Sequence, residues 1–306
     1  MVTVVGSFNM DLFIETPRFP APGEAILGKN FRRAPGGKGA NQAFAVARMG
    51  MQSAIIGAVG RDAFGDEMVA NLEAVGVQTS RVMRRDAIAS GTAMIVLDAA
   101  GQNQIVVANG ANDTLTAAEV RASAALFRKS KAALIQFETP MPSVEAALRL
   151  ARKSGALAVL NPAPFTPVSD RVLRLADWII PNEGEASKLT GVDVRNIASA
   201  AKAAVALKRR SRCDNVLITL GAGGAWLDTP SFAGHIAGFK VTAVDTVGAG
   251  DTFIGAFVVK LVEGATPREA ARFGCAAAAI AVTRRGAQAS IPARAEVEHW
   301  LKSRAN

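Results

Sequence analysis

Short apolar runs alternate with longer segments whose apolar residues recur at helical spacing, and this pattern covers most of the chain. The apolar runs predict buried strands over residues 2–5, 53–59, 132–136, 156–160, 178–180 and 215–219. The segments between them predict helices, among them residues 65–75, 143–153, 183–189 and 253–262. Such alternation is typical of a mostly parallel sheet covered by helices on both faces, with ligands at the carboxyl ends of its strands.

Two regions interrupt this alternation. Residues 12–33 contain three prolines between short alternating pieces, and residues 91–108 predict a hairpin around Ala100-Gly101. Both are expected to form small β pieces that leave the main body, the alternative being a pair of ordinary surface hairpins. No internal repeat, low-complexity tract or linker is evident, so a single domain is expected over residues 1–306.

A glycine turn meets an acidic residue at a helix start in the segment Asp245-Thr246-Val247-Gly248-Ala249-Gly250-Asp251-Thr252-Phe253. Residues 240–244 before it alternate as a strand would, and Gly264 is expected to end the helix. Free N–H groups at a helix start attract anions, and glycines let a phosphate approach the backbone. Asp251 therefore suits a general base acting while the amides hold a phosphoryl group, the alternative being an N-cap in a turn.

A second glycine-rich helix start is Ala34-Pro35-Gly36-Gly37-Lys38-Gly39-Ala40-Asn41-Gln42-Ala43, and its helix is expected to run to about Met49. The glycines would bring backbone close to a ligand, and Lys38 and Asn41 supply polar groups that can meet hydroxyls. The alternative is a flexible loop capped by Asn41. Neither turn fits a P-loop, because Gly-x4-Gly-Lys-Ser/Thr does not occur, and neither fits a dinucleotide-binding fingerprint.

Composition narrows the class of protein. The chain has 306 residues and 50% hydrophobic composition, which is ample for a large buried core. Cys213 and Cys275 lie far apart and form no metal pattern, which suggests reduced thiols in the cytoplasm. His235 and His299 are too scattered for a histidine metal site, and His299 is expected at the surface.

No targeting or membrane segment is expected. Residues 1–13 have no basic region and only a short apolar run, unlike a signal peptide. The apolar run over residues 275–282 is too short to span a membrane and suits a buried helix.

The net charge of +9 raises the question of a nucleic-acid partner. The densest basic cluster lies at the end of an alanine-rich helix, where cations favour the macrodipole, and consists of Lys202, Lys208, Arg209, Arg210 and Arg212. Few aromatic residues accompany it, and tyrosine is absent from the chain. The cluster is therefore interpreted as a solvated helix end and not as a nucleic-acid patch.

At its two glycine turns the sequence resembles the PfkB family of carbohydrate kinases. Gly36-Gly37-Lys38-Gly39-Ala40-Asn41 is similar to the first signature of the family, and Asp245-Thr246-Val247-Gly248-Ala249-Gly250-Asp251 is similar to the second. The likeness extends from Gly6-Ser7-Phe8-Asn9-Met10-Asp11 to Arg285-Gly286-Ala287-Gln288. It also includes Asn161-Pro162-Ala163-Pro164, Pro181-Asn182-Glu183 and Thr219-Leu220-Gly221.

The resemblance implies the ribokinase-like fold, a three-layer α/β sandwich with a mostly parallel central sheet and helices on both faces. It also implies a small β lid at about residues 12–35 and 91–108. In this family such a lid covers the sugar and often forms a dimer contact, so a homodimer through the lid is expected.

For catalysis, the resemblance implies that Asp251 accepts the proton of a terminal sugar hydroxyl while that oxygen attacks the γ-phosphorus of ATP. The backbone amides of Gly248, Ala249 and Gly250 match the anion hole. These few parts can suffice, because phosphoryl transfer depends mainly on positioning and charge stabilisation.

The sugar-binding positions implied by the resemblance are Asn9, Asp11, Gly37, Lys38, Gly39, Asn41, Glu138 and Asp251. Carboxylates and amides suit polyols, because they form charge-assisted or paired hydrogen bonds with hydroxyls. Asn9 and Asp11 are expected at the carboxyl end of the first strand, and Glu138 after the strand over residues 132–136. Any one of them alone could be a cap or turn residue. Strand geometry would point Met10 away from its neighbours, whereas contact between Met10 and the sugar would favour a deoxy sugar.

The nucleotide positions implied by the resemblance are Asn182, Glu185, Thr219, Gly221, Gly224, Gly250 and Cys275. Asn182 and Glu185 match an Asn-x-x-Glu motif tied to phosphate and Mg²⁺, and a capping box can coexist with that role. Gly221 and Gly224 resemble a loop that holds adenosine, or else a plain hairpin. Cys275 stands where relatives often have a histidine near the nucleotide.

A monovalent cation site is also implied. The positions that match potassium-binding residues, mostly through backbone carbonyls, are Asp245, Val247, Ala281, Arg284, Gly286 and Ser290. The alternative is a helix C-terminus at Arg284-Arg285-Gly286, where basic residues and glycine are common.

The sequence therefore predicts an ATP-dependent sugar kinase that uses Mg²⁺ and K⁺ and phosphorylates a pentose, with ribose converted to ribose 5-phosphate as the preferred reaction. Another kinase of the family, acting on fructose, deoxyribose or a nucleoside, would share the same parts. A sugar- or nucleotide-responsive binding protein that kept the fold, or a nucleic-acid binder, would also be compatible with the sequence.

Overall fold

A mostly parallel sheet forms the centre of the molecule. In the computed structural model, which describes residues 1–304, nine strands form one large sheet in the order β13-β12-β11-β10-β9-β8-β1-β4-β5. Neighbouring strands are parallel from β11 to β5, while β12 and β13 pair antiparallel at one edge. The strands are β1 (Val2–Val5), β4 (Ser53–Gly60), β5 (Gln78–Arg85), β8 (Ala132–Ile135), β9 (Leu157–Leu160), β10 (Trp178–Ile179), β11 (Asn215–Thr219), β12 (Gly224–Thr229) and β13 (Phe232–Ala237).

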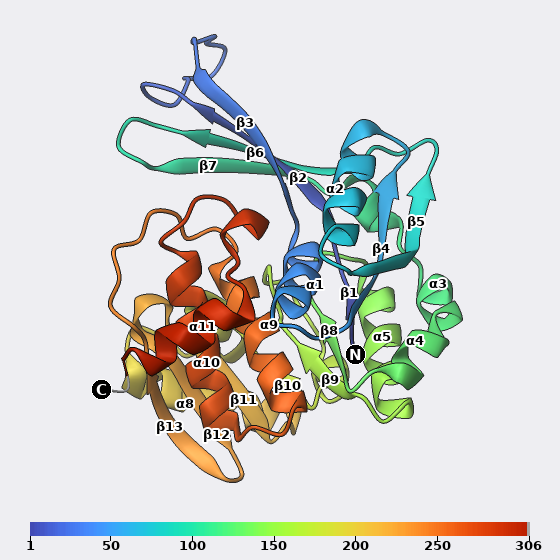
Figure 1. Cartoon of the computed structure of the whole chain (residues 1–306), viewed down its shortest axis with the longest axis vertical. Coiled ribbons are helices and arrows are strands. Elements are labelled where there is room, and N and C mark those ends of the chain that lie inside the picture. The colour runs from blue at the N-terminus through green and yellow to red at the C-terminus, as the bar shows by residue number, and fades with distance from the viewer. Residues whose placement is uncertain (305–306) are drawn as a thin grey trace.

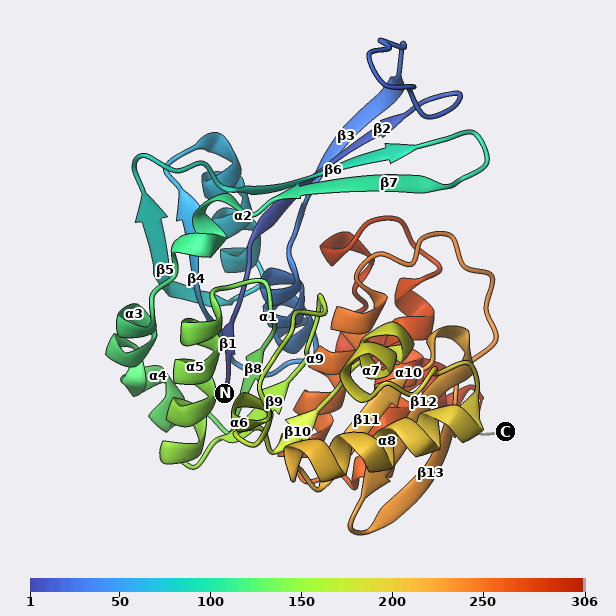
Figure 2. The same ribbon diagram turned by 180° about the vertical axis from the view of Figure 1, so that it is seen from behind.

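Helices cover both faces of this sheet, which gives three layers (Figures 1 and 2). One face carries α1 (Lys38–Arg48), α2 (Ala63–Glu73), α9 (Ala249–Val262), α10 (Pro267–Ala281) and α11 (Arg294–Lys302). The other carries α3 (Ala117–Ala122), α4 (Ala124–Lys129), α5 (Met141–Lys153), α6 (Asp170–Leu173), α7 (Glu183–Thr190) and α8 (Ile197–Ser211). Short 3₁₀ helices are η1 (Gly110–Thr114), η2 (Gly221–Gly223) and η3 (Gln288–Ser290).

Alternation along the strands explains the two layers of core. In β8, Leu134 packs into the hydrophobic cluster with α1 and α9, whereas the next residue, Ile135, packs into the cluster with α5 and α8. Both faces of the strand are therefore buried, which is why the parallel strands appear in the sequence as continuous apolar runs. The predicted α/β architecture is confirmed, with element ends shifted by one to a few residues.

A second, smaller sheet projects from the main body. Its strands are β2 (Asn9–Glu15), β3 (Lys29–Gly36), β6 (Gly91–Leu97) and β7 (Asn103–Ala108), in the order β3-β2-β6-β7. Figures 1 and 2 show this small sheet standing away from the helical layers. The hairpin predicted around Ala100-Gly101 is confirmed, since β6 and β7 pair antiparallel across that turn.

The strand predicted over residues 240–244 is wrong. The edge strand β13 ends at Ala237, and the chain then runs without regular structure to the start of α9. The amides of Val244 and Asp245 donate to the carbonyl of Val282, at 2.7 and 3.2 Å, just beyond α10. The segment is tied to a helix end and has no neighbouring strand, so its alternating side chains do not produce a strand.

No helix among residues 1–304 combines the length and apolar character that crossing a bilayer requires.

Candidate active site

The two glycine turns open into helices that pack against each other. Gly255 of α9 lies so close to α1 that a Cβ at this position would be 2.5 Å from the Cβ of Ala45. The N-cap of α9 is Gly248, which has φ 74° and ψ 0°, a left-handed conformation that favours glycine. Asp251 is the third residue of that helix, so the interpretation of Asp251 as an N-cap is wrong. The helix start has no side-chain cap. The Ala249 amide donates to the carbonyl of Thr246 at 3.3 Å, while the amide of Gly250 has no intrahelical partner.

The carboxylate of Asp251 is buried and receives one hydrogen bond on each oxygen. Asn41 Nδ2 donates to Oδ2 at 2.9 Å, and Gln42 Nε2 donates to Oδ1 at 3.0 Å. Burial raises the pKa of Asp251, and the charge of Lys38 together with the two amide donors acts in the opposite direction. The group is therefore an acceptor whose proton affinity exceeds that of an exposed aspartate.

Asn9 and Asp11 lie at the start of a strand of the small sheet, separated from the end of β1 by residues 6–8, so the prediction that they leave the first strand directly is wrong. They belong to β2, where Asn9 pairs with Gly36 and Asp11 pairs with Ala34. A Cβ on Gly36 would lie 2.4 Å from Asp11 Oδ2, so glycine is what allows the backbone of the second glycine turn to approach this carboxylate.

Asp11 titrates far above the usual range of an aspartate. Burial raises its pKa to about 7, and the negative charges of Glu138 and Asp251 add to this effect. Arg32 and Lys38 oppose it. For Lys38, burial acts to lower the pKa, but the surrounding carboxylates outweigh burial and raise it. The site thus gathers several carboxylates around one ammonium group.

Glu138 joins three segments of the chain. It follows β8, as predicted, and its carboxylate accepts from the amide of Lys38 at 3.0 Å and from the hydroxyl of Ser7. Ser7 in turn accepts from the amide of Gly39 at 3.4 Å. The end of β1, the start of α1 and the end of β8 therefore meet at one place.

Asn9 is oriented by a residue outside the predicted site. Asn112 of η1 donates to the side-chain oxygen of Asn9 at 2.9 Å and pairs with both backbone groups of Phe8. With its oxygen occupied, Asn9 has its own NH₂ group available for a ligand.

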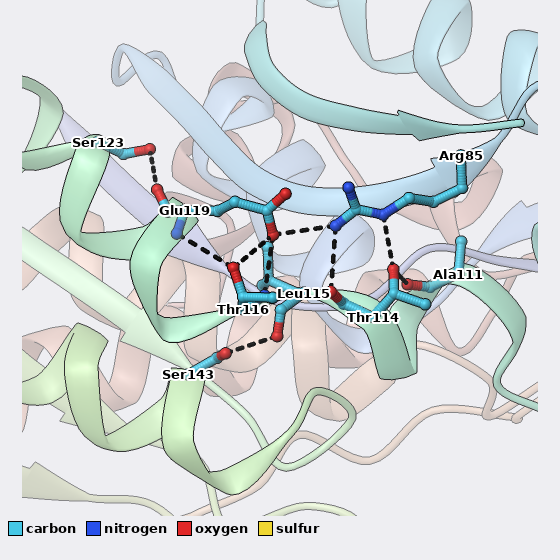
Figure 3. A network of polar contacts seen from close by, with 8 residues as sticks. All are labelled: Arg85, Ala111, Thr114, Leu115, Thr116, Glu119, Ser123 and Ser143. Atoms are coloured by element: carbon cyan, nitrogen blue, oxygen red, sulfur yellow. Dashed lines mark hydrogen bonds and ion pairs between the residues drawn. The ribbon is translucent and has the colours of Figure 1, made fainter.

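A polar network holds η1 in place. Figure 3 shows the Arg85 guanidinium between α3 and the end of η1. It donates to Thr114 Oγ1 at 2.8 Å and to Glu119 Oε2 at 2.9 Å. The network thereby links the edge of the large sheet to the base of the small sheet, where Asn112 lies.

The other predicted cluster lies at the start of α7. Asn182 and Glu185 form a reciprocal capping box, as the sequence predicted. Asn182 also bridges to Thr219 at the end of β11. Burial raises the pKa of Glu185, while the Asn182 amide and Lys38 oppose that effect. The electrostatic interaction between Glu185 and Lys38 connects this cluster with the carboxylates of Asp11, Glu138 and Asp251.

The turn from β11 to β12 contains Gly221 and Gly224, both at positive φ. A Cβ on Gly224 would lie 2.1 Å from the carbonyl oxygen of Ile236, so only glycine fits there. A cavity of about 290 Å³ adjoins this turn and is lined by residues that include Glu183, Gly223 and His235.

Cys275 is buried on α10 within the same hydrophobic cluster as Phe253. Burial raises the pKa of its thiol to about 12, so the group is neutral and unreactive at physiological pH. Both cysteines are free, and His299 is exposed as predicted.

The residues of the predicted cation site lie on two segments that touch. Asp245 accepts from the amide of Val247 at 3.0 Å and from the amide of Gly286 at 2.9 Å. The guanidinium of Arg284 pairs with Glu296. The predicted cation site would therefore use the backbone of Arg284 and not its side chain. Within residues 1–304, no group of three or more His, Cys, Asp or Glu side chains is arranged to hold a metal ion.

A groove of about 840 Å³ separates the small sheet from the loop before α9. It is lined on one side by residues such as Phe13, Arg32 and Ile95, and on the other by Val244, Asp245 and Arg285.

The sequence did not identify four buried polar residues as site residues. They are Ser7, Gln42, Asn112 and Gln136. The signal available for Gln42 was its position next to Asn41 at a helix start, in a stretch that is otherwise small and apolar.

Comparisons with known proteins agree with this geometry. Residues 1–294 match the model of the pfkB family of carbohydrate kinases. A ribokinase of Haemophilus influenzae is 44% identical over 301 residues, which cover 98% of each chain. Among solved structures, a ribokinase from Thermotoga maritima is 36% identical with a TM-score of 0.89, covering 98% of this chain and 99% of that one. An Arabidopsis thaliana ribokinase complexed with ribose and ATP is 32% identical with a TM-score of 0.92, covering 98% of each chain.

The raised pKa of Asp11 predicts how its replacement changes stability with pH. Because this pKa rises from 3.8 to about 7, the folded protein retains a proton there that the unfolded chain releases. The free energy of unfolding therefore falls as pH rises from about 4 to about 7, by at most about 4 kcal/mol. Asp11→Asn should raise the free energy of unfolding at pH 8 and change it little near pH 4, as measured by urea unfolding.

Asp62→Asn is a control that should change the free energy of unfolding at pH 8 in the opposite direction. Although burial opposes them, hydrogen bonds from Ser90 and Gly65 lower the pKa of Asp62. Its carboxylate therefore stabilises the protein at neutral pH, and that stability is lost as pH falls. Asp62→Asn should destabilise at pH 8, and an Asp11→Asn effect that is the same at both pH values would contradict the prediction.

Proposed function

The chain belongs to the pfkB family of carbohydrate kinases, and from this premise we propose that it transfers the γ-phosphoryl group of ATP to the terminal hydroxyl of D-ribose, giving D-ribose 5-phosphate and ADP. The observation that carries the proposal is the buried Asp251 carboxylate beside the uncapped start of α9. A base and an anion site are thereby adjacent, as phosphoryl transfer to a hydroxyl requires.

In the proposed step, the terminal hydroxyl oxygen of the sugar forms a bond to the γ-phosphorus of ATP. The bond between that phosphorus and the bridging oxygen breaks, and ADP leaves with the electron pair. The hydroxyl proton passes to the carboxylate of Asp251. The amides of Gly248, Ala249 and Gly250 stabilise the negative charge on the transferred group.

Sugar recognition is assigned to the polar groups that converge at the start of α1. These are Asn9, Asp11, Gly37, Lys38, Gly39, Asn41 and Glu138, with Asp251 at the reacting hydroxyl. Their carboxylates accept from sugar hydroxyls, while Lys38 and the amides donate. Met10 is completely buried in the hydrophobic core, so we assign it no contact with the sugar, which favours ribose over a deoxy sugar.

The nucleotide is assigned to the side of Lys38 that lies opposite the sugar residues. Asn182, Glu185 and Thr219 would contact the phosphates, and Gly221 and Gly224 the adenosine. Gly250 would contribute through its amide, and Cys275 would present a small apolar surface to the nucleotide.

Glu185 fits a magnesium site, because it is a buried carboxylate with one oxygen held by the Asn182 amide. When bound, Mg²⁺ neutralises phosphate charge and retains several waters, so a full set of protein ligands is not required. Asp245 joins two loops by accepting from the amides of Val247 and Gly286. A potassium ion would be bound by backbone carbonyls of these loops, namely those of Val247, Ala281, Arg284, Gly286 and Ser290.

The small sheet is assigned as a lid over the sugar, within a single domain. Its strands frame the 840 Å³ groove, and its closure would exclude water and limit ATP hydrolysis. One face of the small sheet carries the exposed apolar side chains of Phe31, Met94 and Val106, whereas Ile105 and Val107 lie on the other face and Leu27 precedes β3. Apolar surface of this kind favours self-association, so we assign a homodimer through the lid.

The main test is ADP formation from ATP with ribose, 2-deoxyribose, fructose and adenosine. We expect the highest kcat/KM with ribose, and a 5-phosphate product identified by NMR. Asp251→Asn should lower kcat by roughly 10²–10⁴-fold, because a general base is lost. The control is Asp86→Asn, which removes a carboxylate that is 82% exposed and should leave kcat unchanged.

Unchanged turnover in Asp251→Asn would reject the assigned base. Preference for another substrate would retain the chemistry and replace ribose. No turnover at millimolar ATP with any of the four substrates would favour a binding protein instead.

The proposed ion sites predict that chelation of Mg²⁺ abolishes ADP formation and that K⁺ raises kcat severalfold. Asp245→Asn should abolish the response to K⁺, because the variant loses a carboxylate that holds the two segments together. The measurement is a K⁺ titration at constant ionic strength. A full K⁺ response in the variant would contradict this site.

The proposed dimer predicts that the double variant Met94→Asp, Val106→Asp is a monomer by light scattering, while the unaltered chain is a dimer. Met94 and Val106 are 59% and 71% exposed, so charge there should oppose burial without disturbing the fold. Val205→Asp, which alters an exposed apolar residue of α8, is the matched control and should remain dimeric. A monomeric unaltered chain at micromolar concentration would refute the assignment.

A further inference from the structure

We propose that Gln42 is a positioning residue that fixes the direction of the Asp251 carboxylate through a chain of buried amides. This inference rests on the proposed function, in which Asp251 is the base. Gln42 begins the second turn of α1 and is completely buried, and its amide donates to the carboxylate of Asp251.

The orientation of the Gln42 amide is imposed by the sheet. The carbonyl of Ile180, just after β10, can only accept, and Asn161 Nδ2 donates to it at 2.8 Å. The side-chain oxygen of Asn161 must then face Gln42 and accept from Gln42 Nε2 at 3.1 Å. Because the NH₂ group of Gln42 has two hydrogens, the second is available for Asp251 Oδ1 at 3.0 Å.

A third amide completes this orientation. Gln136 Nε2 donates to Gln42 Oε1 at 2.6 Å, and the Gln136 side chain is also completely buried. An inverted Gln42 amide would place its oxygen against the Asp251 carboxylate and against the side-chain oxygen of Asn161. Both contacts would be repulsive, so Asn161 and Asp251 select the donating orientation. Among the described residues Gln136 Oε1 has no hydrogen-bond partner, so the Gln136 amide follows this orientation and holds the oxygen of Gln42.

Gln42 differs from Asn41, which holds the other oxygen. Asn41 is assigned to the sugar as well as to Asp251, and its own oxygen accepts from Gln288 at 3.2 Å. Gln42 has only protein partners, and its single contact with the reaction is through Asp251. Loss of Gln42 should therefore alter the base and leave the binding of sugar largely intact.

The effect on proton affinity follows from the charges that face Asp251. Lys38 of α1 lowers its pKa, while Asp11 of β2 and Glu185 of α7 are negative groups coupled to it, and Glu138 acts on the same Lys38. A hydrogen bond to the charged form stabilises that form. Removing the Gln42 donor should therefore raise the pKa of the base and shift the acidic limb of the kcat profile to higher pH.

Gln42→Met preserves length and removes both donors. We expect the kcat plateau to fall about 10- to 100-fold, as for the loss of a hydrogen bond to a charged group. The acidic limb of kcat should move upward by about one pH unit. KM for ribose and for ATP should stay near the values of the unaltered chain, which a general loss of structure would not allow.

Gln136→Met is the second variant and carries the test if Gln42→Met does not fold. It leaves the Gln42 donor in place but removes the group that holds Gln42 Oε1, so an upward shift of the limb smaller than that of Gln42→Met is expected, with a smaller loss of kcat. Gln52→Met is the matched control, because Gln52 is exposed in the turn between α1 and β4 and should show an unaltered profile.

The outcomes separate this inference from the proposed function. A pH profile of Gln42→Met or Gln136→Met that superimposes on that of the unaltered chain would overturn the positioning role while Asp251 remains the base. A loss confined to KM for ribose would also overturn it, by making Gln42 a sugar contact. Full activity in Asp251→Asn would instead reject the proposed base itself.

Discussion

The structure depends on keeping one carboxylate ionisable in a buried place. Asp251 lies in the first turn of a helix that is otherwise packed between the sheet and its neighbours, where an isolated charge would be costly. Three features make this position tolerable: an amide donor on each oxygen, the nearby charge of Lys38, and the partial positive charge of a helix start. The same features would keep the group ready to accept a proton.

A second constraint follows from the sugar. A polyol needs many acceptors, and the site places Asp11, Glu138 and Asp251 within mutual electrostatic range around Lys38. Burial raises the pKa of Asp11 most, and the resulting repulsion adds to that rise. Stability is thus lower than a neutral set of side chains would allow, and hydroxyl groups that donate to these carboxylates would relieve the strain on binding.

The elements that carry the site differ in how firmly packing holds them. The base, the helix starts and the amide chain lie on elements of the large sheet, whose two hydrophobic clusters surround them. The small sheet contributes Asn9 and Asp11 from its base, where Asn112 and the Arg85 network hold it. Its outer strands, β3 and β7, are largely exposed. The base therefore lies where packing fixes geometry, while the outer strands of the small sheet have few packing partners.

The sequence by itself determined the alternation of most of the parallel strands with helices, the two glycine turns and the placement of Asp251 at a helix start, because these depend on local periodicity and on residues close together in the chain. It misassigned residues 240–244, since alternation alone does not reveal whether a neighbouring strand exists. Gln42 and Asn161 are 119 positions apart, and Gln42 and Asp251 are 209 apart, so their contact could not be inferred from local pattern. Only the tertiary structure decided which buried amides face the base and in which direction, because a hydrogen bond depends on where the fold places two groups.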